Sequence, residues 1–425
     1  MPASLLFSLT FSALLVATLT VRFWLSTRQA RHVAAHRASV PSAFTQTVTL
    51  SAHQKAADYT LAKGRFGLLT AAFSAAVLLG WTLLGGLDLL NLVVRDAVQP
   101  RFGNMAYQLA LLTAFGVLGG LLDLPFELYS TFRLEQRFGF NRMNWKMYLS
   151  DTLKTSFVGL LIGLPVAALI LWIMGSAGEL WWLWAWCAWM GFNLLILVLY
   201  PTVIAPLFNK FEPLKDETLQ ARVQALMVRC GFAAKGLFVM DGSKRSAHAN
   251  AYFTGFGASK RVVFYDTLLS KLTPGEVEAV LAHELGHFKH KHVVKRMMVM
   301  FAMSAVAFAL LGWMSTQAWF YNGLGVRPLM NAPNDATALL LFLLVAPVFS
   351  FFVSPIFASS SRRHEFEADA YARLQSDGRD LKTALLKLME DNASTLTPDP
   401  LFVRFYYSHP PARERLAALS VNQSN

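Results

Sequence analysis

Seven apolar stretches, each long enough to cross a lipid bilayer, limit the folds that this 425-residue chain can adopt. Hydrophobic residues make up 55% of the sequence and charged residues only 15%, a balance typical of membrane proteins. Because backbone polar groups need internal hydrogen-bond partners in lipid, such stretches predict helices. We therefore expect a mainly α-helical integral membrane protein with spans at 4–24, 66–90, 106–128, 154–176, 180–207, 296–318 and 337–358.

The distribution of lysine and arginine between the spans predicts an orientation. Nearly all of them fall in the segments 25–65, 129–153, 208–295 and 359–425. The loops 91–105, 177–179 and 319–336 hold only Arg95, Arg101 and Arg327. Because basic segments stay in the cytoplasm, we expect the first span to be an uncleaved anchor with the N-terminus outside. The C-terminus is then expected inside. The basic flanks account for the net charge of +12, which therefore indicates no nucleic-acid partner.

A metal-binding pattern, His283-Glu284-x-x-His287, lies in the largest polar segment. Residues four apart share a helix face, so both imidazoles reach one metal ion, and the glutamate is placed to take a proton from water. The sequence Thr-Pro-Gly-Glu from Thr273 predicts the start of this helix with a capping box. The alternative is an amphipathic helix with two surface histidines, since the five-residue pattern alone is only moderately specific.

A zinc site needs a third protein ligand, and the segment 361–373 offers candidates. Glu365 and Asp369 share a helix face, so Glu365 completes the ligand set and Asp369 accepts a hydrogen bond from a ligating imidazole. Glu367 and His364 lie off this face and are weaker candidates. Alone, such a run is typical of a solvated helix, but with the upstream histidines it predicts a metal site.

The polar segment 208–295 is expected to be a mixed α/β domain that contains the metal-binding helix. We predict a helix at 213–230, a strand at 237–240, and a hairpin formed by 251–256 and 261–264 through residues 257–260. The first hairpin strand, with Ala251, Tyr252 and Phe253, is expected to be an exposed edge that binds an extended peptide. Gly286, between the two histidines, predicts close approach of a strand or of substrate backbone.

The chain is expected to divide into four parts: 1–207 with five spans, 208–295, 296–358 with two spans, and 359–425, which completes the metal site. Two cysteines, Cys187 and Cys230, do not indicate a disulfide framework. His290 and His292 alternate with lysines, a pattern more typical of an interfacial basic flank than of extra ligands.

Five motifs resemble the type I CAAX prenyl endopeptidases, integral-membrane zinc proteases related to the heat-shock membrane metallopeptidases. They are DLPFELYSTFRLEQRFGFN (123–141), SKRSAHANAYFTGFGASKRVVFYDTLL (243–269), LAHELGHFKHKH (281–292), RRHEFEADAYA (362–372) and YSHPPARERL (407–416). The resemblance covers nearly the whole chain, and the first motif separates the chamber-forming branch from smaller relatives. It implies seven transmembrane helices around a water-filled chamber, with a gluzincin-like α/β zinc-protease domain on the cytoplasmic side.

The resemblance also implies a role for each site residue. His283, His287 and Glu365 match the ligands of one zinc ion, and Glu284 matches the catalytic base. Asn250 matches a residue beside the scissile bond, and His409 matches one that hydrogen-bonds the reacting carbonyl. Arg415 lies nearby in the same motif as His409. Judged without the resemblance, the asparagine is typical of a turn and the histidine of an exposed loop.

Peptide-bond hydrolysis is the activity that the resemblance implies, with peptide or protein substrates met at the bilayer. The substrates are either prenylated C-termini or membrane proteins under quality control, and the sequence favours neither. A seven-span transporter with an accidental motif and a non-catalytic zinc-bound scaffold are the alternatives. Asp123 and Glu127, at helical spacing in the third span, either line the chamber or lie near the interface or a basic neighbour.

Overall fold

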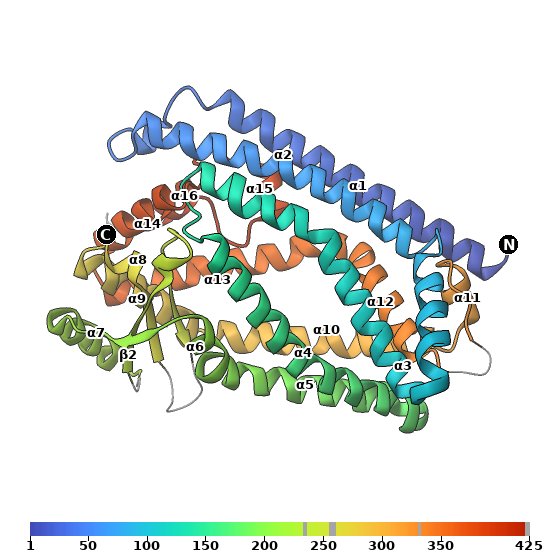
Figure 1. The fold of residues 1–425 in the computed structure, drawn as a ribbon. Helices are drawn as coiled ribbons and strands as arrows, with labels where there is room; N and C mark the ends of the chain where they lie inside the picture. The colour runs from blue at the N-terminus through green and yellow to red at the C-terminus, as the bar shows by residue number, and fades with distance from the viewer. Residues whose placement is uncertain (233–235, 255–260, 330–332, 421–425) are drawn as a thin grey trace.

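The structure is a computed structural model that describes residues 1–232, 236–254, 261–329 and 333–420. Its framework is a bundle of long helices (Figure 1). Seven helices are long and apolar enough to cross a membrane, which confirms the predicted number of spans. Fewer than half of the residues in each apolar window are buried, so a bilayer is needed to cover the rest. The long helices are α1 (Ala3–Ala35), α2 (Leu50–Trp81), α3 (Gly86–Tyr129), α4 (Trp145–Ser176), α5 (Trp181–Leu199), α10 (His292–Met314) and α12 (Asp335–Ser350).

The boundaries between the second and third spans differ from the prediction. The stretch 66–90 is not one span, because α2 ends at Trp81 and a turn through Gly85, in the left-handed region at φ 77°, leads into α3. The predicted loop 91–105 belongs to α3, which is kinked at Gly103 with φ 79°. Glycine adopts positive φ without steric cost, so at both points the chain turns without an extended loop.

Asp123 and Glu127 are exposed on α3 and form no ion pair with any residue that the structure describes. An ion pair with a basic neighbour therefore does not stabilise these two carboxylates. The two other predicted locations, the lining of the chamber and the membrane interface, remain possible for them.

The four basic segments of the sequence meet at one end of the bundle, here called the basic end (Figure 1). Arg28, near the C-terminal end of α1, pairs with Asp399 at 2.9 Å, which joins this helix to the C-terminal segment. Arg245 pairs with Asp151 at 2.8 Å, which joins the α/β domain to the start of α4. The N-terminus and α11 (Ala318–Asn322) lie at the opposite end. The basic segments of the sequence therefore lie together at one end of the molecule, opposite the end that contains the N-terminus.

A four-stranded sheet at the basic end has the strand order β1-β2-β4-β3. Its strands are β1 (Phe211–Pro213), β2 (Gly236–Met240), β3 (Ala251–Thr254) and β4 (Arg261–Tyr265). β3 is an outer strand that pairs antiparallel with β4, with Ala251 opposite Phe264, so the predicted edge position is confirmed. The predicted turn at 257–260 lies outside the described residues.

Helices surround this sheet and complete the domain at the basic end. They are α6 (Ala205–Phe208), α7 (Glu217–Arg229), α8 (Asp266–Leu269), α9 (Pro274–Lys289), α14 (Gly378–Asp391), α15 (Pro400–Tyr406) and α16 (Ala412–Ser420). α9 begins with the predicted capping box between Thr273 and Glu276. Its apolar face, including Leu281 and Leu285, is buried in a core shared with the sheet and with Ala372. α12 continues through a short 3-10 turn into α13 (Ser354–Gln375), which therefore reaches from the bundle into this domain.

Candidate metal centre

Close contact between α9 and α13 brings the two halves of the predicted metal site together. A Cβ atom added at Gly286 would lie 2.9 Å from the Cα atom and 3.0 Å from the carbonyl oxygen of Ala368. The glycine thus lets the two helix backbones pack closely, which offsets its low helix propensity. The predicted close approach exists, but the approaching backbone is that of α13 and not a strand or a substrate.

His283 and His287 of α9 and Glu365 of α13 form a compact cluster. The Nε2 atoms of the two histidines are 3.2 Å apart, and the carboxylate oxygens of Glu365 lie 3.5 Å and 3.4 Å from them. Zinc ligands at about 2.0–2.1 Å in tetrahedral geometry are about 3.4 Å from one another, so this donor set fits a zinc ion. Because the side chains of His283 and Glu365 are almost fully buried, a metal here would be shielded from bulk water.

Asp369 and Arg415 hold this cluster from behind. The Nδ1 atom of His283 lies 2.8 Å from a carboxylate oxygen of Asp369, and the guanidinium of Arg415 donates to both oxygens of that carboxylate at 2.5 Å and 2.8 Å. Burial disfavours the charged form of His283, but its hydrogen bonds to Asp369 and Glu365 outweigh this effect and raise its pKa to about 9 in the metal-free protein. Asp369 thus occupies the predicted position beside the imidazole of His283.

His292 forms a second support that the sequence analysis missed. Its Nδ1 atom lies 2.9 Å from Nδ1 of His287, and its Nε2 atom lies 2.8 Å from a carboxylate oxygen of Glu367. The residue is 2% exposed, so it is not part of an interfacial basic flank. The sequence gives no direct signal for this contact, because a helix break at Lys291 (φ 56°) separates the two histidines.

A cavity of about 1250 Å³ opens onto the cluster and contains further predicted residues. Glu284 and Tyr252 line it, as does His409, whose Nε2 atom lies 3.4 Å from a carboxylate oxygen of Glu365. The other walls are mainly apolar and come from α10, α12, α13 and α15, with side chains that include Val299, Met300, Met303, Ala346, Phe357 and Phe405. The cavity therefore joins a polar cluster to an apolar wall.

Two predicted catalytic residues lie elsewhere. Arg415 is 8% exposed and is not among the described residues that line the cavity; it contacts the predicted metal ligands His283 and Glu365 instead. Asn250 is exposed at the start of β3, where its side chain accepts a hydrogen bond from the amide of Ala251 at 2.8 Å. The hydrogen bonds and ion pairs of the described residues do not link it to the cluster. Ala251 is buried, and the side chain of Phe253 lies outside the description.

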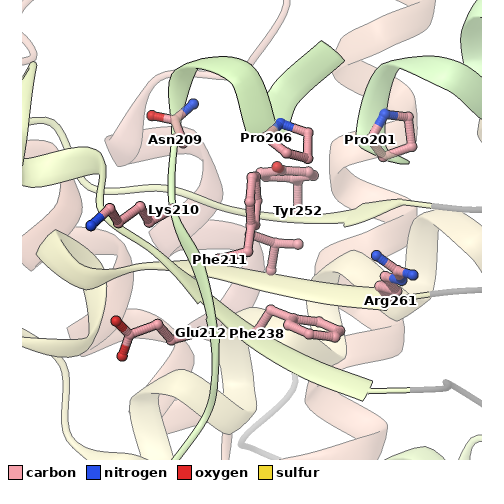
Figure 2. A pocket seen from close by; sticks show the side chains of 10 residues that line it. Pro201, Pro206, Asn209, Lys210, Phe211, Glu212, Phe238, Tyr252 and Arg261 are labelled. Atoms are coloured by element: carbon pink, nitrogen blue, oxygen red, sulfur yellow. The ribbon is translucent and has the colours of Figure 1, made fainter. Parts of the chain in front are cut away.

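A second pocket, of about 390 Å³, is lined by residues from all four strands of the sheet and from the segment before β1 (Figure 2). Tyr252 lines both this pocket and the large cavity, together here with Pro201, Pro206, Phe238 and Arg261. Its described lining includes none of the predicted metal ligands. The chemistry that the cluster supports therefore belongs to the large cavity.

Comparison with known families agrees with this arrangement. A model described as CAAX prenyl protease N-terminal, five membrane helices, matches residues 29–210, and the model of peptidase family M48 matches residues 213–422. The chain belongs to peptidase family M48. It is thus a multi-pass membrane metallopeptidase of the CAAX prenyl protease type; the family implies a metal, and the histidine–glutamate cluster could hold one.

Relatives of the M48 chain cover nearly its whole length. It is 31% identical to the CAAX prenyl protease 1 homolog of Homo sapiens, with 96% of the chain and 95% of the relative aligned, and 34% identical to CAAX prenyl protease 1 of Saccharomyces cerevisiae, with 86% and 85% aligned. The crystal structure of S. mikatae Ste24p superposes with a TM-score of 0.91 at 30% identity, covering 99% of each chain. The fold and the resemblance inferred from the sequence are therefore confirmed.

Proposed function

We propose that this M48 peptidase is a zinc metalloendopeptidase that binds one zinc ion through His283, His287 and Glu365. The observation that carries the proposal is the spacing of the three donors, 3.2 Å, 3.4 Å and 3.5 Å, beside a cavity that Glu284 also lines. Bound zinc would supply Lewis-acid activation of water and of the peptide carbonyl.

Glu284 would act as the general base. It takes a proton from the attacking water and returns it to the leaving amine, so no covalent intermediate is needed. Its position one residue after His283 on α9, with its side chain lining the cavity, supports this role. His409 would donate a hydrogen bond to the carbonyl oxygen as negative charge develops, and its place beside Glu365 supports that assignment.

Residues outside the cavity would orient the ligands. Asp369 fixes the tautomer of His283, and Arg415 holds Asp369, so the arginine is a positioning residue and not a catalytic one. His292 would do the same for His287 from the other side, with Glu367 as its own acceptor.

The edge strand β3 would bind an extended substrate through its main chain, with Asn250 at the start of the strand beside the scissile bond. The apolar wall of the cavity supports a substrate that carries a hydrophobic group, so we propose processing of prenylated C-termini, the activity named in the relatives. Quality control of membrane proteins is the second candidate.

The orientation follows from the charge pattern. We propose that the basic end, with the metal centre and the C-terminus, faces the cytoplasm and that the N-terminus lies outside. A seven-span transporter or a zinc-bound scaffold is disfavoured, since neither function requires Glu284 and His409 beside the same cavity as the ligands.

A cleavage assay with matched peptides tests this function. The zinc-loaded protein in liposomes would receive a peptide with a farnesylated C-terminal CAAX sequence and the same peptide with a free cysteine. Mass spectrometry should detect release of the last three residues, faster from the farnesylated peptide. Failure to cleave either peptide would refute the endopeptidase, whereas equal rates would refute only the preference for a prenyl group.

A further inference from the structure

A second group of side chains that could hold a metal ion lies beside the proposed catalytic centre. His290, His292 and Glu367 each offer a donor atom, and these atoms all lie within 4.8 Å of one another. Two imidazoles and one carboxylate form the same kind of donor set as the catalytic cluster. A third imidazole, His364, stacks on His292 at a ring distance of 4.0 Å, and its buried Nδ1 atom has no hydrogen-bond partner among the described residues.

The helix break at Lys291 creates this group. Lys291 adopts φ 56° and ψ 33°, a left-handed conformation that is unfavourable for a residue with a side chain. The break separates α9 from α10 and leaves the rings of His290 and His292 nearly parallel, 5.5 Å apart. Residues two apart do not face each other in a continuous helix, so the pairing depends on this strained residue.

The hydrogen bonds of His292 connect the second group to the first. If His287 binds the catalytic metal through Nε2, its Nδ1 atom carries a proton. This N–H group then donates a hydrogen bond to Nδ1 of His292. His292 then carries its own proton on Nε2, which donates to Glu367. A metal bound at Nε2 of His292 would replace that proton. A neutral His292 would then carry its proton on Nδ1 and would no longer accept the hydrogen bond from His287.

We propose that His290, His292 and Glu367 form a second, inhibitory site for zinc or a similar divalent transition metal, which works against the catalytic centre through His292. The inference rests on the proposed zinc ligation by His287. Excess metal would fill the second site and remove the support of a catalytic ligand. His292 is thus shared between a positioning role and a regulatory one.

The surroundings make the second site the weaker of the two. It has one carboxylate, Glu367, whose side chain is 45% exposed, and the cationic Lys295 lies near that carboxylate. The catalytic cluster is more buried, and Asp369 supports it. Metal should therefore enter the catalytic centre first, so that inhibition begins only when metal is in excess.

The test measures metal binding and proteolysis separately. Metal-free protein in detergent would be titrated with zinc, with bound metal measured by equilibrium dialysis and elemental analysis, and cleavage of a fluorogenic peptide would be followed at each zinc concentration. The variants are His290→Ala and Glu367→Gln, with His36→Ala as a control for an exposed histidine elsewhere. His290 is not in the catalytic machinery, so His290→Ala should keep the activity seen at one equivalent of zinc.

We expect two zinc ions per chain in the wild type and in His36→Ala, with loss of activity as the second binds. His290→Ala and Glu367→Gln should lose the second equivalent, and His290→Ala should stay active in excess zinc. One zinc per chain in the wild type, or equal inhibition of wild type and His290→Ala, would overturn the inhibitory site. Because zinc counting needs no substrate, a failed cleavage assay would contradict the proposed function without deciding the second site.

Discussion

The Nδ1 atom of His283 lies 2.8 Å from a carboxylate oxygen of Asp369, and both side chains are buried. The contact joins α9 to α13 and leaves Nε2 of the histidine facing His287 and Glu365. Asp369 therefore determines which ring nitrogen is free to bind a metal, and Arg415 keeps the carboxylate charged and in place.

Replacing Asp369 with asparagine should weaken zinc binding by about 10- to 100-fold, because the charged acceptor for the His283 proton is lost. Competition with a chromogenic chelator would measure the affinity. Asp96→Asn, which changes an exposed carboxylate on α3, is the matched control. Equal affinities for the two variants would show that Asp369 does not act on the metal.

Glu284 and Glu365 should separate catalysis from metal binding. Glu284→Gln should retain the zinc of the catalytic centre and lose peptide hydrolysis by orders of magnitude, because the base and not a ligand is removed. Glu365→Ala should lose the metal, since it removes one of three donors. The mechanism is wrong if Glu284→Gln cleaves peptide at the parental rate.

Features that depend on local sequence were predictable. The spans follow from apolar length, α9 from its cap and apolar spacing, and the pairing of Glu365 with the histidines from helical periodicity. The outer position of β3 also agreed with the prediction. Each of these signals lies within one element or between the two elements that meet at the proposed metal site.

Features that depend on contacts between distant elements were not predictable. His292 looks like part of a basic run, and only the break at Lys291 and the position of α13 turn it toward His287. Arg415 was expected among the catalytic residues, but packing of α16 places it behind Asp369. The kink at Gly103 replaced a predicted loop, since hydropathy does not distinguish a polar helix from a turn.

Zinc affinity should depend on pH through His283. In the metal-free protein the pKa of this imidazole is raised to about 9, so it is protonated at neutral pH, and a metal must displace that proton. Apparent affinity should therefore rise about ten-fold per pH unit between pH 7 and 9 and then level off. Isothermal titration in buffers of different ionisation enthalpy would count the released proton. In Asp369→Asn the rise should end at lower pH.

His409→Ala and Asn250→Ala should lower kcat by roughly ten- to a thousand-fold, the range for losing one transition-state donor, without changing zinc content. Because His409 contacts Glu365, we expect the larger loss of kcat in His409→Ala. Steady-state kinetics with elemental analysis would measure both quantities. Unchanged kcat in His409→Ala would remove this residue from the mechanism, and the same result for Asn250→Ala would leave it only its turn contact with Ala251.

Gly286→Ala should destabilise the protein and weaken metal binding, although alanine favours a helix by about 0.5–1 kcal/mol over glycine. The new methyl group would meet the backbone of Ala368 at 2.9 Å and 3.0 Å, and backbone cannot move aside as a flexible side chain does. Overpacking of this kind costs about 1–3 kcal/mol, so the clash outweighs the gain in propensity. Separation of α13 from α9 would carry Glu365 away from the histidines.

Gly116→Ala, where nothing lies within 4 Å of the added atom, is the matched helical control. Thermal unfolding in detergent with and without zinc would compare the two variants. An equal or higher melting temperature for Gly286→Ala, with unchanged zinc affinity, would show that α9 and α13 can separate without disturbing the site.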